Sequence, residues 1–325
     1  MFVVIFQFKS LLNLFEHRHV AHFEAVLGTA LEVQITAGSR GAALKAETAL
    51  LTEIDRLELV FSRFNPVSEL NRWQTKMRQP VAVSNDLRVV LESALRWQTW
   101  SGGAFHPGAD ALSRLWQGAA RASVAPSKDQ IAAILETLQQ PLYEVSSGSA
   151  TRLSAAPLNF NAFAKGYIVD CATRAAKESA GVSSVLVNIG GDLRHIGAGA
   201  VTVGIANPAS NADNLEPLCQ IRVTSGGVAS SGQSQRGVRI AGQWYSHVID
   251  PRTGHPVEHV IGASVIAPTS ATADVLATVF GVLEPRESLA LARGLPDVGL
   301  LIVAQNGAVT RNEVWERCEV FTKSS

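Results

Sequence analysis

Apolar positions along the first part of the chain follow first the period of a strand and then that of a helix. Residues 30–37 alternate between apolar and polar side chains, which predicts a strand, and Gly38 to Gly41 are expected to form the turn after it. The next apolar residues recur at spacings of four, three and four, which predicts one face of an amphipathic helix. The residues of that face are Leu50, Ile54, Leu57 and Phe61.

Two further helices are marked by their N-terminal residues. Ser84 is a favourable N-cap for a helix that ends at Gly102-Gly103. Ser127 and Gln130 have the spacing of a capping box. The residues expected to be buried are Leu87, Val90, Leu91 and Ala94 in the first helix, and Ile131, Ile134, Leu135 and Leu138 in the second.

From residue 184 onward the pattern is dominated by short apolar runs typical of strands. They read VLVNIGG, VTVGIA, CQIRV, GGVASSG, YSHVI, GASVIA and GLLIVA, with helices expected near 163–180, 270–283 and 286–293. A helix-rich N-terminal part followed by a strand-rich C-terminal part predicts the α+β class. We expect a single domain over 1–325, with two subdomains meeting near 145–160.

Composition and charge narrow the functional class. The 325 residues are 46% hydrophobic and 17% charged, as in globular proteins. The 28 basic residues balance the 28 acidic ones, so the basic field that favours nucleic acid is not expected. Three cysteines, Cys171, Cys219 and Cys318, are too few and too scattered for a disulfide framework or a zinc site.

The N-terminal stretch 1–19 is hydrophobic, but it has no basic start and no small-residue cleavage site. Its apolar run is interrupted at Gln7 and Lys9, and no run in the chain approaches the length of a membrane span. We therefore expect an ordinary first strand or docking segment and a cytoplasmic location. A periplasmic location is the alternative, should a longer export signal precede this stretch.

The segment ATADVLATVF places a carboxylate and a hydroxyl on one side of a predicted helix. Asp274 and Thr278 are four residues apart, so their side chains point the same way. Oxygen ligands of this kind suit Mg²⁺. The alternative is that Asp274 only caps the helix or complements its dipole.

Two other segments contain groups that could act on a phosphate. In YSHVIDPRTGHP, His247 lies within a predicted strand and could act as a general base, and Arg252 in the turn that follows could bind phosphate. A strand histidine followed by a tight turn is the alternative. In NFNAFAKGYIVDCA, Lys165 could supply a cation at the start of a helix.

Glycines and aromatic residues complete the candidate features. Gly190-Gly191 ends a predicted buried strand and allows either a close backbone approach or simply a tight turn. Phe105 and Phe64 could each offer a flat surface to a ring, although most aromatic side chains belong to the core.

Taken together and in this order, these segments resemble the FAD:protein FMN transferases, the ApbE family. The resemblance covers nearly the whole chain from about Leu27. Its most specific blocks are AKGYIVD, VNIGGDL, HVIDPRTG and the helix of Asp274 and Thr278.

The resemblance implies an α+β, T-fold-like, Mg²⁺-dependent transferase. Such enzymes split FAD and attach FMN through a phosphoester bond to a threonine of a partner flavoprotein, with AMP as the leaving product. Two alternatives stay open: a non-catalytic flavin-binding paralogue, and an FAD pyrophosphatase that releases FMN and AMP.

The resemblance also assigns roles to particular positions. It implies Asp274, Thr278 and the backbone carbonyl of Ala162 as metal ligands, and His247 as the catalytic histidine. The positions that match flavin-nucleotide contacts are Phe64, Ala104, Phe105, His106, Asn159, Lys165 and Val248.

The chain departs from the family pattern at several positions. Asn159 stands where the family usually has an aspartate, which removes a carboxylate. His106 stands where the family has the aspartate of Phe-Asp-Pro, which exchanges an acceptor for a group able to carry positive charge. Leu27 replaces the usual methionine, and the lipoprotein cysteine of the family is missing.

Overall fold

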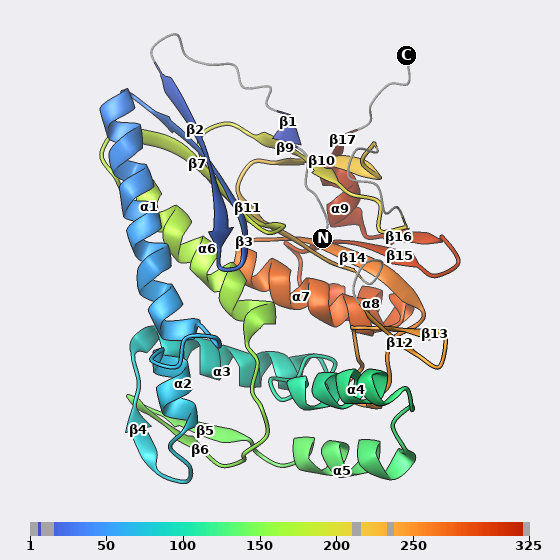
Figure 1. Cartoon of the computed structure of the whole chain (residues 1–325). Coiled ribbons are helices and arrows are strands. Elements are labelled where there is room, and N and C mark those ends of the chain that lie inside the picture. Colours follow the sequence, from blue (N-terminus) through green and yellow to red (C-terminus); the bar gives the residue numbers. More distant parts are fainter. Residues whose placement is uncertain (1–5, 8–15, 210–215, 233–236, 321–325) are drawn as a thin grey trace. The chain divides into compact units, whose positions relative to one another are not determined.

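The computed structural model describes residues 6–7, 16–209, 216–232 and 237–320 (Figure 1). The helices are α1 (Arg40–Phe61), α2 (Glu69–Gln74), α3 (Asn85–Trp100), α4 (Asp110–Ala122), α5 (Lys128–Leu138), α6 (Asn161–Lys177), α7 (Ser270–Val282), α8 (Pro285–Ala292) and α9 (Glu313–Cys318). The strands are β1 (Phe6–Gln7), β2 (His17–Val26), β3 (Thr29–Ala37), β4 (Pro80–Ala82), β5 (Tyr143–Ser146), β6 (Ser149–Arg152), β7 (Val182–Ile189), β8 (Asp192–Gly197), β9 (Val201–Ile205), β10 (Cys219–Val223), β11 (Gly226–Gly232), β12 (Gly237–Ile240), β13 (Gln243–Ser246), β14 (Val260–Ala267), β15 (Gly299–Ala304), β16 (Val309–Arg311) and β17 (Glu319–Val320).

The chain divides into two compact units, each built from separate stretches of sequence. Unit 1 contains residues 1–56, 165–234 and 260–325, and unit 2 contains 57–164 and 235–259. Helices α1 and α6 each run from one unit into the other. Of the boundaries between the two units, the one at 164/165 is nearest to the division expected at 145–160.

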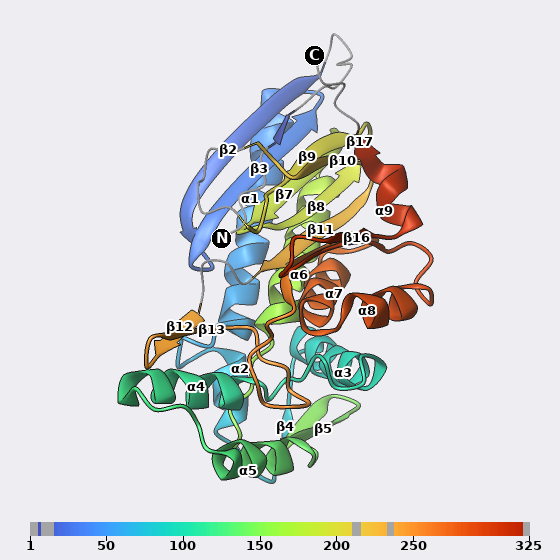
Figure 2. The same cartoon turned by 90° about the vertical axis from the view of Figure 1, so that its right-hand side faces the viewer.

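Unit 1 is built around an eight-stranded sheet in the order β16-β15-β14-β11-β8-β7-β3-β2, and each of its ladders is antiparallel. Side chains of a strand alternate between the two faces of its sheet. Leu31, Val33 and Ile35 of β3 accordingly share one face and are fully buried. Helices α1, α6 and α7 run along this sheet (Figures 1 and 2).

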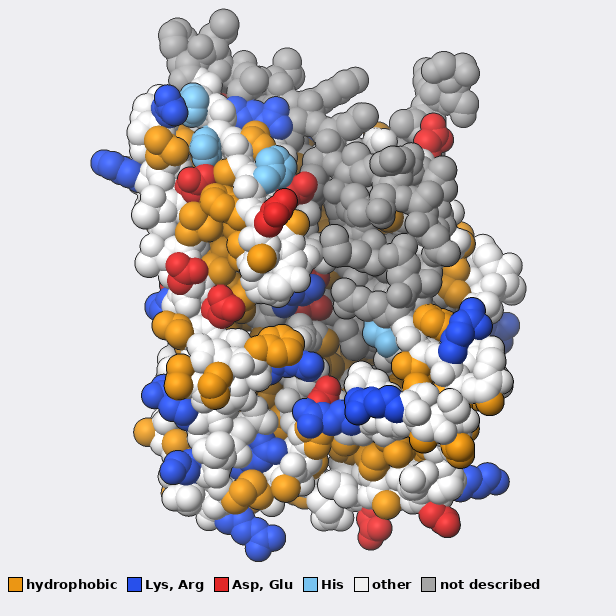
Figure 3. Space-filling model, in the orientation of Figure 1, with side chains coloured by type: hydrophobic (Ala, Val, Ile, Leu, Met, Phe, Trp, Pro, Cys, Tyr) orange, Lys and Arg blue, Asp and Glu red, His pale blue; other side chains and the backbone are white. Residues whose placement is uncertain are grey.

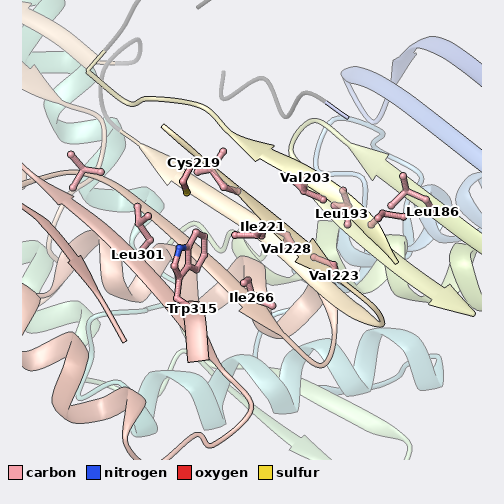
Figure 4. Packing of buried hydrophobic residues seen from close by; sticks show 13 residues of the cluster. Leu186, Leu193, Val203, Cys219, Ile221, Val223, Val228, Ile266, Leu301 and Trp315 are labelled. Atoms are coloured by element: carbon pink, nitrogen blue, oxygen red, sulfur yellow. The ribbon is translucent and has the colours of Figure 1, made fainter. Parts of the chain in front are cut away.

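A smaller four-stranded sheet, β1-β9-β10-β17, packs with the large sheet around a second apolar core. On β11, Gly227 faces α7, because a Cβ there would lie 2.4 Å from the Ser270 nitrogen. The next residue, Val228, points the other way, into the cluster that contains Ile221 and Trp315 (Figure 4). The central strands of unit 1 are therefore covered on both faces, which explains why their sequences are apolar almost throughout.

Unit 2 contains α3, α4 and α5, the three-stranded sheet β4-β6-β5 and the hairpin β12–β13. Its buried aromatic side chains donate hydrogen bonds to backbone carbonyls of segments distant in sequence. Tyr143 donates its hydroxyl to the Leu91 carbonyl at 3.0 Å, and Trp73 donates its ring N–H to the Ala150 carbonyl at 3.1 Å. Trp116 reaches the carbonyl of Gly254 at 2.9 Å.

The elements expected from strong periodicity and caps are confirmed. Strand 30–37 is β3, and the face of Leu50 to Phe61 is the buried side of α1. The Ser84 N-cap and the Ser127–Gln130 capping box are both present. The turn expected at 38–41 is shorter, because the Ser39 hydroxyl accepts from the Ala42 N–H and α1 begins at Arg40.

The face drawn in Figure 3 shows both acidic and basic side chains among the described residues. Among the helices in the described part of the chain, none has the length and apolar character needed to cross a bilayer. Most of the N-terminal stretch 1–19, on which the location prediction depends, lies outside the described residues. The cytoplasmic location stays a prediction.

Candidate functional site

Helix α7 carries both side chains expected to bind a metal. Asp274 and Thr278 lie one turn apart on this helix, as predicted. Asp274 is buried, with 9% of its surface exposed, and Thr278 is half-buried. The hydroxyl of Thr269 caps the helix by accepting from the Thr272 N–H at 3.1 Å. Asp274 is therefore not the residue that caps α7.

The Asp274 carboxylate lies against the neighbouring helix α6. The Gly166 N–H donates to Oδ2 of Asp274 at 3.3 Å. Burial and the charge of Asp192 raise the pKa of Asp274 well above its usual range, while Lys165 and the Gly166 N–H lower it. The net direction is upward, because burial of the carboxylate and the nearby charge of Asp192 outweigh Lys165 and the Gly166 N–H.

Asp192, which the sequence analysis did not single out, lies at the start of β8, directly after the Gly190-Gly191 turn. Both glycines have positive φ, +59° and +98°, so the pair makes the tight turn that joins β7 to β8. Nζ of Lys165 lies 2.8 Å from Oδ2 of Asp192. Burial raises the pKa of Asp192 although Lys165 lowers it. We call Lys165, Asp192 and Asp274 the carboxylate cluster.

The carboxylate cluster fits a hard divalent cation. Two buried carboxylates interact with one lysine, and a cation bound beside them would reduce the free-energy cost of burying their negative charge. Within the described ranges, no group of three or more His, Cys, Asp and Glu side chains is arranged to hold a metal. The Asp274 carboxylate and the Thr278 hydroxyl on one helix face are nevertheless oxygen donors of the kind that Mg²⁺ accepts, and Mg²⁺ usually keeps several other ligand positions for water and phosphate.

Helices α6 and α7 cross in direct backbone contact at Gly166. A Cβ at this position would lie 2.6 Å from both the Ala271 Cα and the Ser270 carbonyl oxygen. The atoms in the way belong to the backbone of α7 and cannot rotate aside. A glycine is therefore required here for close approach, and the approach is what allows the Gly166 N–H to reach Asp274.

We expect Gly166→Ala to destabilise the protein by about 1–3 kcal/mol, because the added methyl forces α6 and α7 apart. Gly118→Ala is the matched control, since Gly118 lies in α4 and a Cβ added there would meet no atom within 4 Å. That change should stabilise the helix by up to about 1 kcal/mol. Chemical denaturation of both variants measures the two effects, and equal changes in both would contradict the close-contact interpretation.

In unit 2, the segment Ala104–Gly108 is largely buried. Ala104 and Phe105 are 1% and 3% exposed, whereas Phe64 is 81% exposed. The His106 ring is 8% exposed and both of its nitrogens are used: Nε2 pairs with the Leu138 carbonyl at 3.1 Å, and Nδ1 accepts from the Gly108 N–H at 3.0 Å. Burial lowers the pKa of His106.

Asn159 connects this segment to the start of α6. Its backbone N–H donates to the Pro107 carbonyl at 2.8 Å, and its side-chain Oδ1 accepts from the Asn161 N–H at 2.9 Å. An amide oxygen thus meets the first turn of α6, where Ala162 lies half-buried. The structure brings Asn159 and the segment of Ala104 to His106 together within unit 2.

The strand predicted for YSHVI is interrupted at His247, although Ile249 forms an antiparallel bridge with Pro256. Strand β13 ends at Ser246, whose hydroxyl accepts from the Val248 N–H at 3.0 Å and bends the chain. His247 is exposed in this bend, and Val248 is half-buried. The tight turn after it is confirmed, with the Gly254 N–H bonded to the Asp250 carbonyl at 2.8 Å.

Arg252 binds the Asp250 carboxylate within the same turn. Its Nε and Nη2 lie 3.0 and 2.8 Å from the two carboxylate oxygens of Asp250. This two-pronged contact rigidifies the turn that follows His247. The guanidinium thus has a structural partner, in line with the alternative interpretation of this segment.

Asp192 shows what the sequence analysis missed and which signal was available. The Gly-Gly pair after an apolar run is typical of a two-residue hairpin turn, and an acidic residue follows it directly. That pattern places Asp192 at the first position of a buried strand, where an isolated carboxylate is costly. A positively charged partner for this carboxylate was therefore to be expected, although the pattern does not identify Lys165 as that partner.

The family model and the relatives that match this chain all belong to one family of proteins. The family model described as "ApbE family" matches residues 27–302. An "FAD:protein FMN transferase" of Treponema pallidum is 31% identical over 315 residues, covering 88% of this chain and 84% of the relative. The protein of the same name from Escherichia coli K12 is 28% identical over 267 residues, covering 78% and 75%.

Solved structures show the same fold. The ApbE protein of Thermotoga maritima superimposes with a TM-score of 0.80 at 24% identity, over 94% of this chain and 100% of that one. The flavin transferase ApbE of Vibrio cholerae gives 0.75 at 20% identity, over 93% and 100%. These likenesses confirm the α+β architecture expected from the sequence.

Proposed function

Because the chain belongs to the ApbE family, we propose that it is an FAD:protein FMN transferase, as its curated relatives are named. The observation that carries the proposal is the carboxylate cluster, in which Asp274 is buried beside Asp192 and Lys165. Buried carboxylates with a raised pKa and a defined charged neighbour are common at functional sites, where burial and charge partners tune the ionisation of reacting or metal-binding groups.

The proposed reaction transfers FMN to a threonine of a partner flavoprotein. The threonine oxygen forms a bond to the phosphorus of the FMN half of FAD, and the pyrophosphate bond to AMP breaks. AMP leaves with the bonding electron pair, and the threonine proton passes to a base. Atoms and charge balance without a redox step.

Asp274, Thr278 and the backbone carbonyl of Ala162 are the proposed Mg²⁺ ligands. When bound, the metal supplies charge neutralisation for the pyrophosphate. Lys165, whose side chain is 32% exposed while its ammonium group contacts Asp192, is the proposed cation for a phosphate oxygen. Asp192 holds that ammonium group in a defined place.

The proposed contacts of the flavin nucleotide come from unit 2. Phe64 presents an exposed ring that can stack on a flat heterocycle. The proposed contribution of the segment Ala104–His106 is its preformed backbone. It supplies no charge, since both nitrogens of the His106 ring are already hydrogen-bonded. The remaining proposed contacts are Asn159 and Val248.

His247 is the proposed acceptor of the threonine proton. It is exposed in the bend after β13, and the turn that follows it is held by the Asp250–Arg252 contact. Imidazole is the side chain best suited to take a proton near neutral pH. A rigid segment around an accessible imidazole is a suitable arrangement for that step.

A binding paralogue without activity is the second candidate, and the observation that favours it is Asn159. Its amide oxygen is bonded to the Asn161 N–H, and no carboxylate is present at this position. A non-catalytic protein would still hold FAD through the contacts of unit 2. An assay of FMN transfer separates the two.

We expect purified protein with FAD and Mg²⁺ to make an acceptor protein fluorescent on a denaturing gel, with AMP released in equal amount. The acceptor carries a threonine site of the Ser/Thr-Gly-Ala-Thr type, and the acceptor with that threonine replaced by alanine is the control. Tight FAD binding without labelling would favour the binding paralogue. AMP release without labelling would identify a pyrophosphatase.

A further inference from the structure

We propose that Asp170 is a positioning residue that fixes α7 against α6 and thereby sets the place of Asp274 in the carboxylate cluster. Asp170 is buried on α6, with 7% of its surface exposed. The inference rests on the proposed function, because the position of Asp274 matters to it as a metal ligand.

Asp170 holds the N-terminus of α7 through both of its carboxylate oxygens. Oδ1 accepts from the Ser270 N–H and Oδ2 from the Ala271 N–H, each at 2.9 Å. The first N–H groups of a helix have no partner within the helix. Here the first two are bonded to a side chain of another helix, and Thr269 caps the third. The cap therefore also links α7 to α6.

The spacing along both helices connects this cap to Asp274. Gly166 and Asp170 are four residues apart on α6, and Ser270 and Asp274 are four apart on α7, so each pair lies on one face. Gly166 contacts the first turn of α7 and donates to Asp274, while Asp170 binds that same first turn. A shift of α7 along α6 would break both sets of bonds together.

Arg194 on strand β8 contacts Asp170 and stabilises the cap of α7. Arg194 Nε lies 3.4 Å from Oδ1 of Asp170, and the same guanidinium donates to the Pro268 carbonyl just before α7. Asp192, two residues earlier on β8, points to the same face of the sheet and meets Lys165. One strand therefore anchors both the lysine of the carboxylate cluster and the residue that fixes α7.

The test is the Asp170→Asn variant of the full chain. Asparagine keeps the size of the side chain but offers one acceptor oxygen, and its NH₂ group faces the second N–H of α7. We expect Mn²⁺ affinity, measured by titration without FAD or acceptor, to fall about tenfold. The Mg²⁺ concentration for half-maximal FMN transfer should rise by a similar factor, while kcat at saturating Mg²⁺ stays within about threefold.

Asn312→Ala is the matched control, because Asn312 caps α9 by accepting from the Trp315 N–H at 3.0 Å, and α9 packs on β15 and β10. It should lower the melting temperature and leave Mn²⁺ affinity unchanged. Should Asp170→Asn fail to fold, Arg194→Gln weakens the same cap and should reduce Mn²⁺ affinity about threefold.

The outcomes separate the inference from the proposed function. A folded Asp170→Asn protein that binds Mn²⁺ as tightly as wild type, or Arg194→Gln with unchanged affinity, overturns the positioning role and leaves the proposed function intact. A wild-type protein that binds no Mn²⁺ overturns the positioning role, and one that also fails to transfer FMN to the acceptor overturns the proposed function as well.

Discussion

Transfer of FMN is expected to cease when Asp274 is replaced by alanine, with kcat/KM falling about a thousandfold or more. The pyrophosphate of FAD carries negative charge that repels an incoming threonine oxygen, and the proposed metal site removes that barrier. Without the Asp274 carboxylate, the site loses its charged ligand on α7 and retains the Thr278 hydroxyl. Fluorescent labelling of the acceptor over time measures the loss, and labelling at the wild-type rate would show that Asp274 is no metal ligand.

Asp274→Asn separates loss of function from loss of fold. Because the pKa of Asp274 is raised in the folded state, the folded protein binds this proton more tightly than the unfolded chain does. The stability of the metal-free protein should therefore rise as the pH falls toward the usual carboxyl range, and ionised Asp274 destabilises the fold at neutral pH. We expect the Asn variant to melt no lower than metal-free wild type, yet to be inactive. Exposed Asp297, changed to Asn, is the matched control for activity.

Helices with one-sided burial were the part of the fold that the sequence predicted best. Leu50 and Leu57 of α1 are fully buried, as their spacing indicated. The caps at Ser84 and Ser127 are local interactions between residues three apart, so sequence alone suffices to find them. The same holds for Asp274 and Thr278, which share a face simply because they share a helix.

The contacts that build the carboxylate cluster, and those that hold α7 against α6, could not be predicted in this way. Lys165 and Asp192 come from a helix and a strand, and Asp170 reaches Ser270 across a hundred positions of sequence. Such pairs depend on how α6 and α7 cross on the sheet, and periodicity contains no information about that crossing.

His106 illustrates how burial can reverse a chemical expectation. The sequence offered a histidine in place of an acidic residue, which suggested a group able to carry positive charge. In the structure the ring is buried and hydrogen-bonded at both nitrogens, and burial lowers its pKa. The neutral form is therefore favoured, so the substitution removes the negative charge of the aspartate without adding a positive one.

The sequence identified His247 as a candidate residue, but it did not predict the backbone conformation around that residue. An alternating pattern predicted a strand through this residue, and the Ser246 hydroxyl ends the strand just before it. The result is an accessible histidine in a bend, a setting better suited to a reacting group than the middle of a ladder, where side chains pack against neighbouring strands.

His247→Ala is expected to lower kcat for FMN transfer by about 10²- to 10⁴-fold, the usual contribution of a positioned general base. The KM for FAD should stay within about threefold, because the proton acceptor is not needed to hold the nucleotide. His255→Ala is the matched control, since His255 is also exposed and lies on the turn that follows. Steady-state kinetics of both variants measure the difference.

The pH profile of the same variants tests the role of the imidazole more directly. A protonated imidazole cannot accept the threonine proton, so the wild-type rate should fall on acidification and the residual rate of His247→Ala should not follow that decline. Added free imidazole should restore part of the activity to His247→Ala and none to Asp274→Ala, because a small base can replace a proton acceptor but not a metal ligand. Equal responses of the two variants would mean that His247 acts on the structure of the bend rather than on the proton.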